Sequence, residues 1–400
     1  MHVDLLSMLF GAVAAGWFLF NISAAWMQRY VPPFSQVLKR APGSDATPSV
    51  TVVIAARDER RRIEESVRRM LAQRGVDLEL VVVDDRSADG TQEILERLRG
   101  VDPRLNVIRV DTLPDGWLGK QHACHIGAQH ARGDWILFTD ADTWINPTLI
   151  ADTIRAAVAE QADLVCLLPA QKKINLWGRA AILVFCLGLL IAAARANRNR
   201  RRSPVGIGAY NLVRAEAYRR AGGYAALRME VIDDMKLGML LERHGSRLRC
   251  WTAADEAEMD WAASPGELMR ALEKNFFALA DLRFGIAAFA VAIMFTAWFA
   301  AIAGLFSGRW TGYAAFAGLM LMPFPAALFA RHSRWGLLPA ILAPAVYPLL
   351  PWTLVRSTWL TWRQGGIRWR GTLYPLDLLR KHLVPLFARA PRDRATGPLR

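Results

Sequence analysis

Three acidic clusters in the first half of the chain have the residue types and the placement for chemistry. Each directly follows a short apolar run, and they are Arg57-Asp58-Glu59, Asp84-Asp85 and Asp140-Ala141-Asp142. Carboxylates gathered at one edge of a sheet repel one another, so we expect a shared cation there. A divalent metal ion carrying a phosphate group fits, because Mg²⁺ uses one or two carboxylates together with phosphate oxygens. Asp85 has a second option without metal, since it could accept a hydrogen bond from a base N–H or a ribose hydroxyl.

The elements that must position these clusters lie between about residues 48 and 265. Apolar runs predict strands at 50–55, 78–83, 105–110 and 135–139, and helical periodicity predicts helices at 57–73 and 92–98. The runs are continuous rather than alternating, which indicates an α/β domain whose mostly parallel sheet is buried on both faces. Ligands of such sheets bind beyond the carboxyl ends of the strands, where each cluster lies. Singly, an Asp-Asp or Asp-x-Asp pair is as often a helix cap or turn, so their order and placement carry the inference.

The composition places this domain at a membrane. Hydrophobic residues make up 53% of the 400 residues, while Lys+Arg outnumber Asp+Glu 50 to 36. This combination excludes a disordered chain, a collagen-like repeat and a disulfide scaffold. The four cysteines have no metal-ligand spacing, so no zinc site is expected. Net charge alone would favour a nucleic-acid partner, but the basic residues cluster beside apolar stretches, which favours anionic lipid instead.

Four uncharged stretches are long enough to reach across a bilayer: residues 5–28, 285–308, 310–330 and 336–355. The first, in an N-terminal unit of residues 1–30, is expected to be an uncleaved anchor, because positive charge follows it rather than precedes it. We therefore expect a multi-pass protein of the inner (cytoplasmic) membrane, with everything from Arg29 to the membrane segments of 283–356 in the cytoplasm.

The last of these stretches decides on which side of the membrane the chain ends, because it sets the number of C-terminal crossings to two or three. Three full C-terminal spans would export residues 357–400, a basic segment that should stay in the cytoplasm. Residues 336–355 are interrupted by Pro339, Pro344, Pro348 and Pro351. We expect them to form a kinked or re-entrant segment packed against protein. The alternative is a complete crossing that leaves the C-terminal segment outside.

Four longer motifs in order resemble a known family. Residues 49–59 (SVTVVIAARDE), 80–91 (LVVVDDRSADGT), 133–142 (GDWILFTDAD) and 232–237 (IDDMKL) resemble family-2-type glycosyltransferases of the GT-A fold, which is Rossmann-like. The likeness covers about residues 48–245. Residues 116–120 (GWLGK) and 367–374 (IRWRGTLY) look like the membrane-bound, lipid-modifying branch, such as hopanoid- and carotenoid-associated or ceramide-type glycosyltransferases.

The resemblance implies roles for the acidic strand ends. Ala55, Arg57, Glu59 and the Asp84-Asp85 pair would bind the nucleotide sugar, and Asp140 and Asp142 would hold its diphosphate and an Mg²⁺ or Mn²⁺ ion. Lys120 could touch the same diphosphate as a point charge, or it could be a solvated lysine at a helix start. A P-loop is excluded, because Gln121 stands where that motif requires Ser or Thr.

The acid pair Asp233-Asp234 should open a helix that runs to about His244. Direct inversion at a sugar carbon needs one carboxylate to take the acceptor's proton, and a helix N-terminus favours its ionised form. By analogy with the family, Asp234 is the candidate base; otherwise the pair merely caps the helix. The Gln-x-x-Arg-Trp motif of processive members is absent, which favours a single transfer. Arg270 and Lys274 are candidates for binding the diphosphate; for Lys274 the alternative is a position at the membrane surface.

Residues 174–195 form an apolar run between Asp142 and Asp234. A single crossing would separate these two acids, so we expect an interfacial or buried helix. The basic residues after it, Arg195, Arg198 and Arg200–Arg202, would then face lipid headgroups, and the helix would guide a lipid acceptor. An ordinary core helix followed by a basic loop is the alternative.

The resulting hypothesis is a membrane-bound, inverting, non-processive glycosyltransferase that passes one sugar from a nucleotide-diphosphate sugar to a lipid hydroxyl, without a nucleic-acid partner. One alternative is a polyprenyl-phosphate glycosyltransferase, whose acceptor needs little help from a base. Another is a non-catalytic membrane adaptor that retains the fold, which would bind no nucleotide sugar.

Overall fold

A computed structural model describes residues 4–43, 47–200, 203 and 205–386. Its centre is an eight-stranded sheet in the order β3-β2-β1-β4-β7-β6-β8-β5. The strands are β1 (Ser49–Ala56), β2 (Asp77–Asp85), β3 (Leu105–Val110), β4 (Trp135–Thr139), β5 (Thr143–Ile145), β6 (Leu164–Gln171), β7 (Asn211–Arg214) and β8 (Leu248–Met259). The pairings β1–β2, β1–β4, β2–β3 and β6–β8 are parallel, whereas β7 runs antiparallel to β4 and β6, and β5 to β8. The expected mostly parallel α/β sheet is confirmed.

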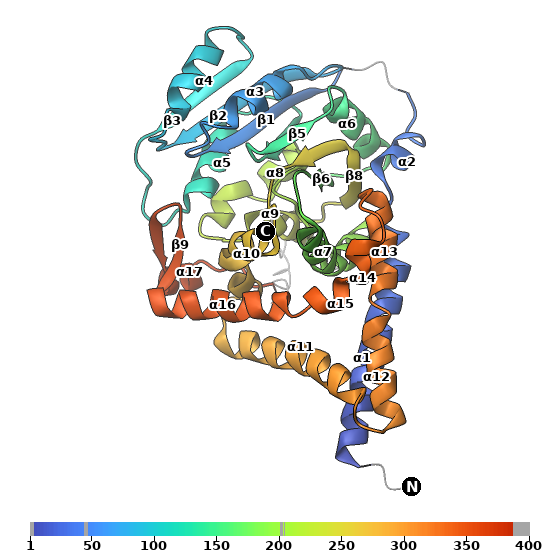
Figure 1. Ribbon diagram of the computed structural model, residues 1–400. Coiled ribbons are helices and arrows are strands. Elements are labelled where there is room, and N and C mark those ends of the chain that lie inside the picture. Colours follow the sequence, from blue (N-terminus) through green and yellow to red (C-terminus); the bar gives the residue numbers. More distant parts are fainter. Residues whose placement is uncertain (1–3, 44–46, 201–202, 204, 387–400) are drawn as a thin grey trace, which may run out of the picture.

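Helices cover this sheet on both faces (Figure 1). They are α2 (Phe34–Leu38), α3 (Ile63–Leu71), α4 (Thr91–Arg99), α5 (Gly119–Gln129), α6 (Leu149–Ala159), α8 (Ala215–Arg220) and α9 (Asp233–Arg243), with a 3₁₀ turn at Gly223–Leu227. The central strands are buried on both faces, as their continuous apolar runs predict, and Val52, Val53 and Ile54 have no exposed surface. The helix predicted at 57–73 begins only at Ile63, because residues 57–62 form a loop at the end of β1.

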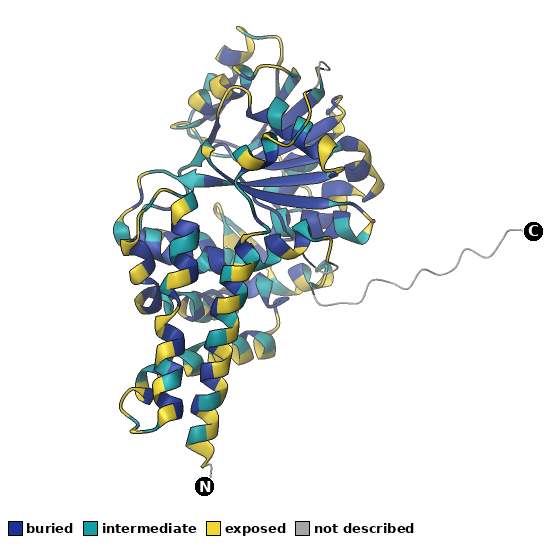
Figure 2. Ribbon diagram, turned by 90° about the vertical axis from the view of Figure 1, so that its right-hand side faces the viewer, coloured by how far each residue is buried: buried dark blue, intermediate teal, exposed yellow. Residues whose placement is uncertain are grey.

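A helical stalk extends from the sheet domain (Figure 1). It contains α1 (Leu5–Gln28), which packs against α11 (Phe284–Gly304), α12 (Trp310–Met320) and α13 (Pro323–His332). Figure 2 shows exposed residues along this stalk, in contrast to the buried strands. Two amide side chains join its helices: Asn21 donates to the carbonyl of Gly318 and Gln28 to that of Pro325, each at 2.9 Å. Such bonds hold helices together in apolar surroundings.

Among the described residues, four helices are long and apolar enough to cross a membrane: Leu5–Gln28, Leu176–Asn197, Phe284–Gly304 and Trp310–His332. Residues 336–355 are not among those found in the described part of the chain. They are divided between α14 (Leu338–Ile341), α15 (Ala343–Val346) and the start of α16 (Leu349–Gln364), which lies across the stalk direction (Figure 1). Trp352, Trp359 and Trp362 of α16 are exposed, as expected for a helix at a membrane surface. That these residues do not cross stays a prediction.

The apolar run at 174–195 forms α7 (Leu176–Asn197), which contacts α1, β8, α13, α14 and α15 and also α10 (Pro265–Leu279). It therefore lies between the sheet and the stalk and is largely covered by protein. The basic residues after it include Arg198, whose guanidinium stacks on Tyr30 and Trp26. Arg201 and Arg202 lie outside the described residues.

The segment that we expected as a basic tail from residue 357 is folded over most of its length. It includes the end of α16, a hairpin of β9 (Gly366–Trp369) and β10 (Thr372–Pro375), and α17 (Leu376–Lys381). The hairpin packs back against α16 and α10. Residues 387–400 lie outside the described part of the chain.

Candidate active site

A cavity of about 470 Å³ opens at the carboxyl ends of β1, β2 and β4. One end, which we call the charged arm, is lined by Arg57, Glu59, Asp85, Lys120, Asp140, Asp142, Asp233, Asp234, Lys274 and Arg370. The other end, the apolar arm, is lined by Ile182, Phe185, Cys186 and Leu189 of α7, Leu272, Phe276 and Leu279 of α10, Phe329 of α13, and Trp261 and Trp335. Both arms belong to one continuous space, so a polar and an apolar ligand can meet in it.

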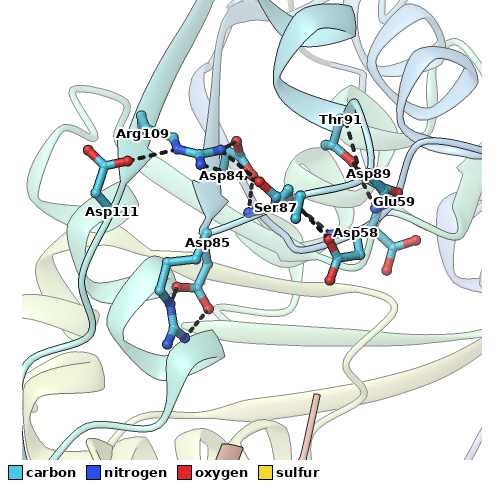
Figure 3. A network of polar contacts seen from close by, with 11 residues as sticks. Asp58, Glu59, Asp84, Asp85, Ser87, Asp89, Thr91, Arg109 and Asp111 are labelled. Atoms are coloured by element: carbon cyan, nitrogen blue, oxygen red, sulfur yellow. Dashed lines mark hydrogen bonds and ion pairs between the residues drawn. The ribbon is translucent and has the colours of Figure 1, made fainter. Parts of the chain in front are cut away.

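The ends of β1 and β2 are tied together by a network of polar contacts (Figure 3). The Ser87 hydroxyl accepts from the Asp58 N–H at 2.9 Å, and the Asp58 carboxylate accepts from the Ala88 N–H at 2.9 Å. The Thr91 hydroxyl accepts from the Glu59 N–H at 2.9 Å. These bonds satisfy the backbone where a regular helix was predicted, and they aim Glu59 toward the cavity.

The adjacent acids Asp84 and Asp85 face different surroundings (Figure 3). Asp85 lines the cavity and forms a two-bond pair with Arg86, at 2.7 and 2.9 Å. Asp84 has no exposed surface and does not line the cavity; its carboxylate accepts from Arg109 and from the Ser87 N–H. Successive side chains of a strand point to opposite faces, so only one of the pair can reach the ligand. The predicted contact of Asp84 with the nucleotide sugar is therefore not supported, and Asp84 fixes the loop instead.

Asp140 and Asp142 follow β4 and have contrasting partners. Asp140 accepts from the Lys120 ammonium at 2.7 Å, and although burial opposes its ionisation, this neighbour lowers its pKa. Asp142 lies 3.6 Å from Arg62, but its Oδ1 is buried without a hydrogen-bond partner. Burial and the nearby Asp140 carboxylate raise the pKa of Asp142 to about 7. Asp142 thus has one buried oxygen that no described group of the chain satisfies.

The acid pair Asp233-Asp234 opens α9, as predicted, and lies in the charged arm. Asp234 accepts from the Gly208 N–H at 2.9 Å and from the Met235 N–H at 2.7 Å, which orients both of its oxygens. Burial and the neighbouring Asp233 raise the pKa of Asp234 to about 6. Asp233 accepts from the Tyr224 hydroxyl at 3.3 Å and lies 3.6 Å from the Lys120 ammonium.

Gly208 brings the two acidic groups together. Its N–H binds Asp234, and a Cβ at this position would lie 2.8 Å from Asp140 Oδ2. A side chain cannot fit there unless an acid moves. Nothing in the sequence around Gly208 predicts this contact.

The hairpin β9–β10, near the C-terminal end of the described chain, contributes Trp369, Arg370 and Tyr374 to the lining of the cavity. Arg370 donates to the Arg57 carbonyl and pairs with Glu59 at 2.6 Å. The Lys274 ammonium lies 3.8 Å from the Trp369 ring centre, and the Tyr374 hydroxyl accepts from the Gly119 N–H at 3.3 Å. Roles for Trp369, Arg370 and Tyr374 were not predicted, although their motif had been noted as part of the resemblance.

Nine of the ten predicted site residues line the cavity: eight belong to the charged arm and the ninth is Ala55, whereas Asp84 does not line it. Six carboxylates face four cations (Arg57, Lys120, Lys274 and Arg370). The buried Asp142 Oδ1, which has no hydrogen-bond partner, fits a divalent cation. Among the described residues no group of three or more His, Cys, Asp or Glu side chains could hold a metal by itself. A metal here would therefore need ligand oxygens as well, such as those of a phosphate.

Comparison with known proteins agrees with this geometry. Residues 51–222 match the family model described as glycosyl transferase family 2. The 4,4'-diaponeurosporenoate glycosyltransferase of Staphylococcus haemolyticus is 29% identical over 150 residues, which cover 38% of this chain and 36% of that protein. The succinoglycan biosynthesis protein ExoO of Rhizobium meliloti is 36% identical over 123 residues, or 31% of this chain and 34% of that protein. The matches thus span about a third of the length of these relatives.

Among solved structures, a mannosyltransferase from Pyrobaculum calidifontis, in complex with GDP-Man and Mn²⁺, superposes with a TM-score of 0.54. It is 19% identical, and the match covers 89% of this chain and 98% of that one. At this identity the likeness concerns the fold. The fold is thus that of GT-A glycosyltransferases, and residues 51–222 are similar to family 2 glycosyl transferases.

Proposed function

We propose that this chain is a membrane-bound, inverting glycosyltransferase that moves one sugar from a nucleotide-diphosphate sugar to a hydroxyl group of a lipid. The observation that carries the proposal is the single cavity with a charged arm and an apolar arm. A water-soluble acceptor would have no use for the second arm. One relative is named for the acceptor diaponeurosporenoate, which supports a lipid as the class of acceptor.

The donor belongs in the charged arm. Asp85, Arg57 and Glu59 lie at the ends of β1 and β2, where parallel sheets bind nucleotides. Lys120, Lys274 and Arg370 can contact the diphosphate as cations. Asp140 and Asp142 would hold a divalent Mg²⁺ or Mn²⁺ ion, which when bound neutralises the negative charge that develops on the leaving diphosphate.

Asp234 is the proposed general base. Its two oxygens are fixed by backbone N–H groups, and its pKa of about 6 leaves it ionised at neutral pH while making it more basic than an ordinary aspartate. It would accept the proton of the acceptor hydroxyl as that oxygen attacks the sugar carbon from the face opposite the diphosphate. One displacement inverts the configuration and needs no covalent enzyme intermediate.

The acceptor's apolar part belongs between α7, α10 and α13. These helices connect the cavity to the stalk, whose helices are apolar enough to lie in a bilayer. Bringing both substrates into one cavity converts an encounter between two molecules into a reaction within one complex. We propose a cytoplasmic orientation of the domain at the inner membrane.

The test is to incubate membranes containing the protein with a panel of labelled UDP- and GDP-sugars and extracted lipids, and to identify products by mass spectrometry. We expect a lipid carrying a single added sugar, with an anomeric configuration opposite to that of the donor by NMR. Sugar found only in a water-soluble polymer, or retention of configuration, would contradict the proposal.

A further inference from the structure

A cluster of charged side chains lies behind the acid pair, away from the cavity. Lys236, one turn into α9, has no exposed surface, and its ammonium lies 3.7 Å from the Glu230 carboxylate and 3.8 Å from that of Asp281. Glu230 precedes α9, and Asp281 follows α10. None of the three residues lines the cavity. The transfer chemistry therefore does not use them, although burying such charges is costly.

Residues 383–386, which follow α17, complete this cluster with their backbone; we call them the strap. The Val384 N–H donates to Glu230, and the Leu386 N–H donates to both oxygens of Asp281, at 3.0 and 3.2 Å. The Lys236 ammonium donates to the Val384 carbonyl. Outside the cluster, Arg243 of α9 donates to the Pro385 carbonyl at 2.6 Å.

The charge balance shows why the strap matters. Glu230 and Asp281 share the Lys236 ammonium, so two carboxylates face one cation. Burial lowers the pKa of Lys236 and raises the pKa of Glu230, which means that the loss of water destabilises the ionised form of both side chains. The two strap N–H groups supply the donors that the second carboxylate lacks. Without them, buried carboxylate oxygens would lack partners, and the segment around them would have to rearrange.

That segment leads directly into the candidate site. The Glu230 carbonyl accepts from the Gln121 side chain at 2.6 Å, and Gln121 follows Lys120 in α5. Asp233 comes three residues after Glu230, and Lys236 lies on the first turn after Asp234. The strap therefore holds residues 230–236 on the side away from the cavity. On the cavity side, Gly208 and Lys120 contact the acid pair.

We propose that the strap positions Asp233 and Asp234 for transfer, acting through Lys236, Glu230 and Asp281 as positioning residues. The catalytic part of this statement depends on the function proposed above, whereas the effect on the structure of α9 does not. Donor binding rests mainly on the ends of β1, β2 and β4, so loss of the strap should lower kcat far more than it raises KM for the donor.

Two truncations separate the strap from the residues beyond it. A chain ending at Leu386 keeps the strap, and a chain ending at His382 lacks it. In lipid nanodiscs, hydrogen–deuterium exchange of peptides covering residues 229–240 should match the full chain in the first variant and be at least about tenfold faster in the second. With the donor and lipid found in the product assay, kcat should fall about 10- to 100-fold only in the second variant.

Side-chain variants test the same cluster within the full-length chain. Lys236→Met should accelerate exchange at 229–240 as the shorter truncation does, because it leaves two buried carboxylates without a cation. Adding Glu230→Gln and Asp281→Asn removes those charges but keeps oxygens that accept from the strap, so protection should return. A merely space-filling lysine would not be rescued in this way.

The proposal is overturned if the chain ending at His382 exchanges and turns over like the full chain, or if the chain ending at Leu386 is equally impaired. Exchange is measured without any substrate. A protein that transfers no sugar but shows the predicted exchange pattern would therefore refute the proposed function and retain the structural role of the strap. If the chain ending at His382 showed unchanged exchange and intact sugar transfer, the role of the strap would be refuted and the proposed function retained.

Discussion

The two arms of the cavity are built in opposite ways. The charged arm takes four of its acids from the ends of neighbouring strands and two, Asp233 and Asp234, from the start of α9. Several of these acids have partners that fix them, such as Lys120 for Asp140 and Arg86 for Asp85. The apolar arm is formed by side chains of α7, α10 and α13, which are far apart in the sequence. The side chains that line it are apolar and make their contacts by packing, whereas polar bonds hold the helices at other positions, such as Asn197 of α7 and Glu273 of α10.

This difference has a consequence for what each arm can select. Directional hydrogen bonds and charges discriminate strongly between ligands, because a wrong ligand leaves buried groups unpaired. An apolar wall discriminates by shape and volume, by a smaller factor for each group. We therefore expect substitutions in the charged arm to abolish transfer and substitutions in the apolar arm to change which lipid is accepted.

The largest effect is expected for Asp234→Asn. The amide keeps the shape but cannot take a proton, so kcat should fall about 10²- to 10⁴-fold, as for loss of a general base. The dissociation constants of UDP and GDP with Mn²⁺, measured by calorimetry, should stay within about twofold of wild type. Near-normal transfer by this variant would instead favour a phosphate acceptor, such as a polyprenyl phosphate, which needs little base help.

Gly208→Ala should impair both donor binding, which uses Asp140, and proton transfer, which uses Asp234. The added methyl group would lie 2.8 Å from the Asp140 carboxylate, so Asp140 or the Asp234 contact must move. We expect kcat/KM to fall about 10- to 100-fold, with weaker nucleotide binding as well. Gly285→Ala is the matched control, because nothing lies within 4 Å of its added methyl. Equal activity of the two variants would show that the acids are not fixed as described.

Leu189→Trp tests the apolar arm. The larger side chain would fill space between α7 and α10 without touching the carboxylates. We expect KM for the lipid acceptor to rise about tenfold, with donor binding unchanged and with acceptors of shorter chain affected less. Gly188→Leu, at the exposed neighbouring position with open space around its Cβ, serves as control. Similar KM values for the two variants would place the acceptor elsewhere.

The smallest effect concerns stability. The pKa of Asp234 lies at about 6 in the fold, against an ordinary value of 3.8. The folded chain holds this proton more tightly than the unfolded one, so Asp234 costs stability increasingly as pH rises through this interval, and the loss is complete above about 6. We therefore compare the Tm of Asp234→Asn with that of wild type in metal-free buffer. The Tm difference in favour of the variant should increase by about 2 °C when the pH is raised from 5 to 8. A difference in Tm that does not change with pH would argue against a buried, perturbed carboxyl.

The same contrast explains how far the sequence alone could lead. Strands β3 and β4 have the predicted bounds, Asp233 opens a helix as predicted, and Glu59, Asp140 and Asp142 line the cavity at the ends of β1 and β4. A pair of neighbouring acids gives no sign in the sequence of which one faces the cavity; in the structure Asp85 lines it and Asp84 does not.

Other features have no local signal at all. Arg370 reaches Glu59 across 311 positions of sequence, and the apolar arm consists of residues that look like any core residue. The strap depends on backbone groups of residues 383–386, whose side chains carry no pattern. Contacts between distant segments decide these features, and a motif cannot encode them.

The central claim is that a nucleotide sugar and a lipid meet in one cavity. The most direct test is photo-cross-linking of the protein in nanodiscs with a long-chain alcohol that carries a diazirine in its alkyl chain, followed by mapping of the labelled peptides. We predict labelling of α7 and α10 at residues around Leu189 and Phe276, reduced by Leu189→Trp and retained when UDP and Mn²⁺ are bound. Labelling confined to the outer faces of α1, α11 and α12, unaffected by Leu189→Trp, would contradict the claim.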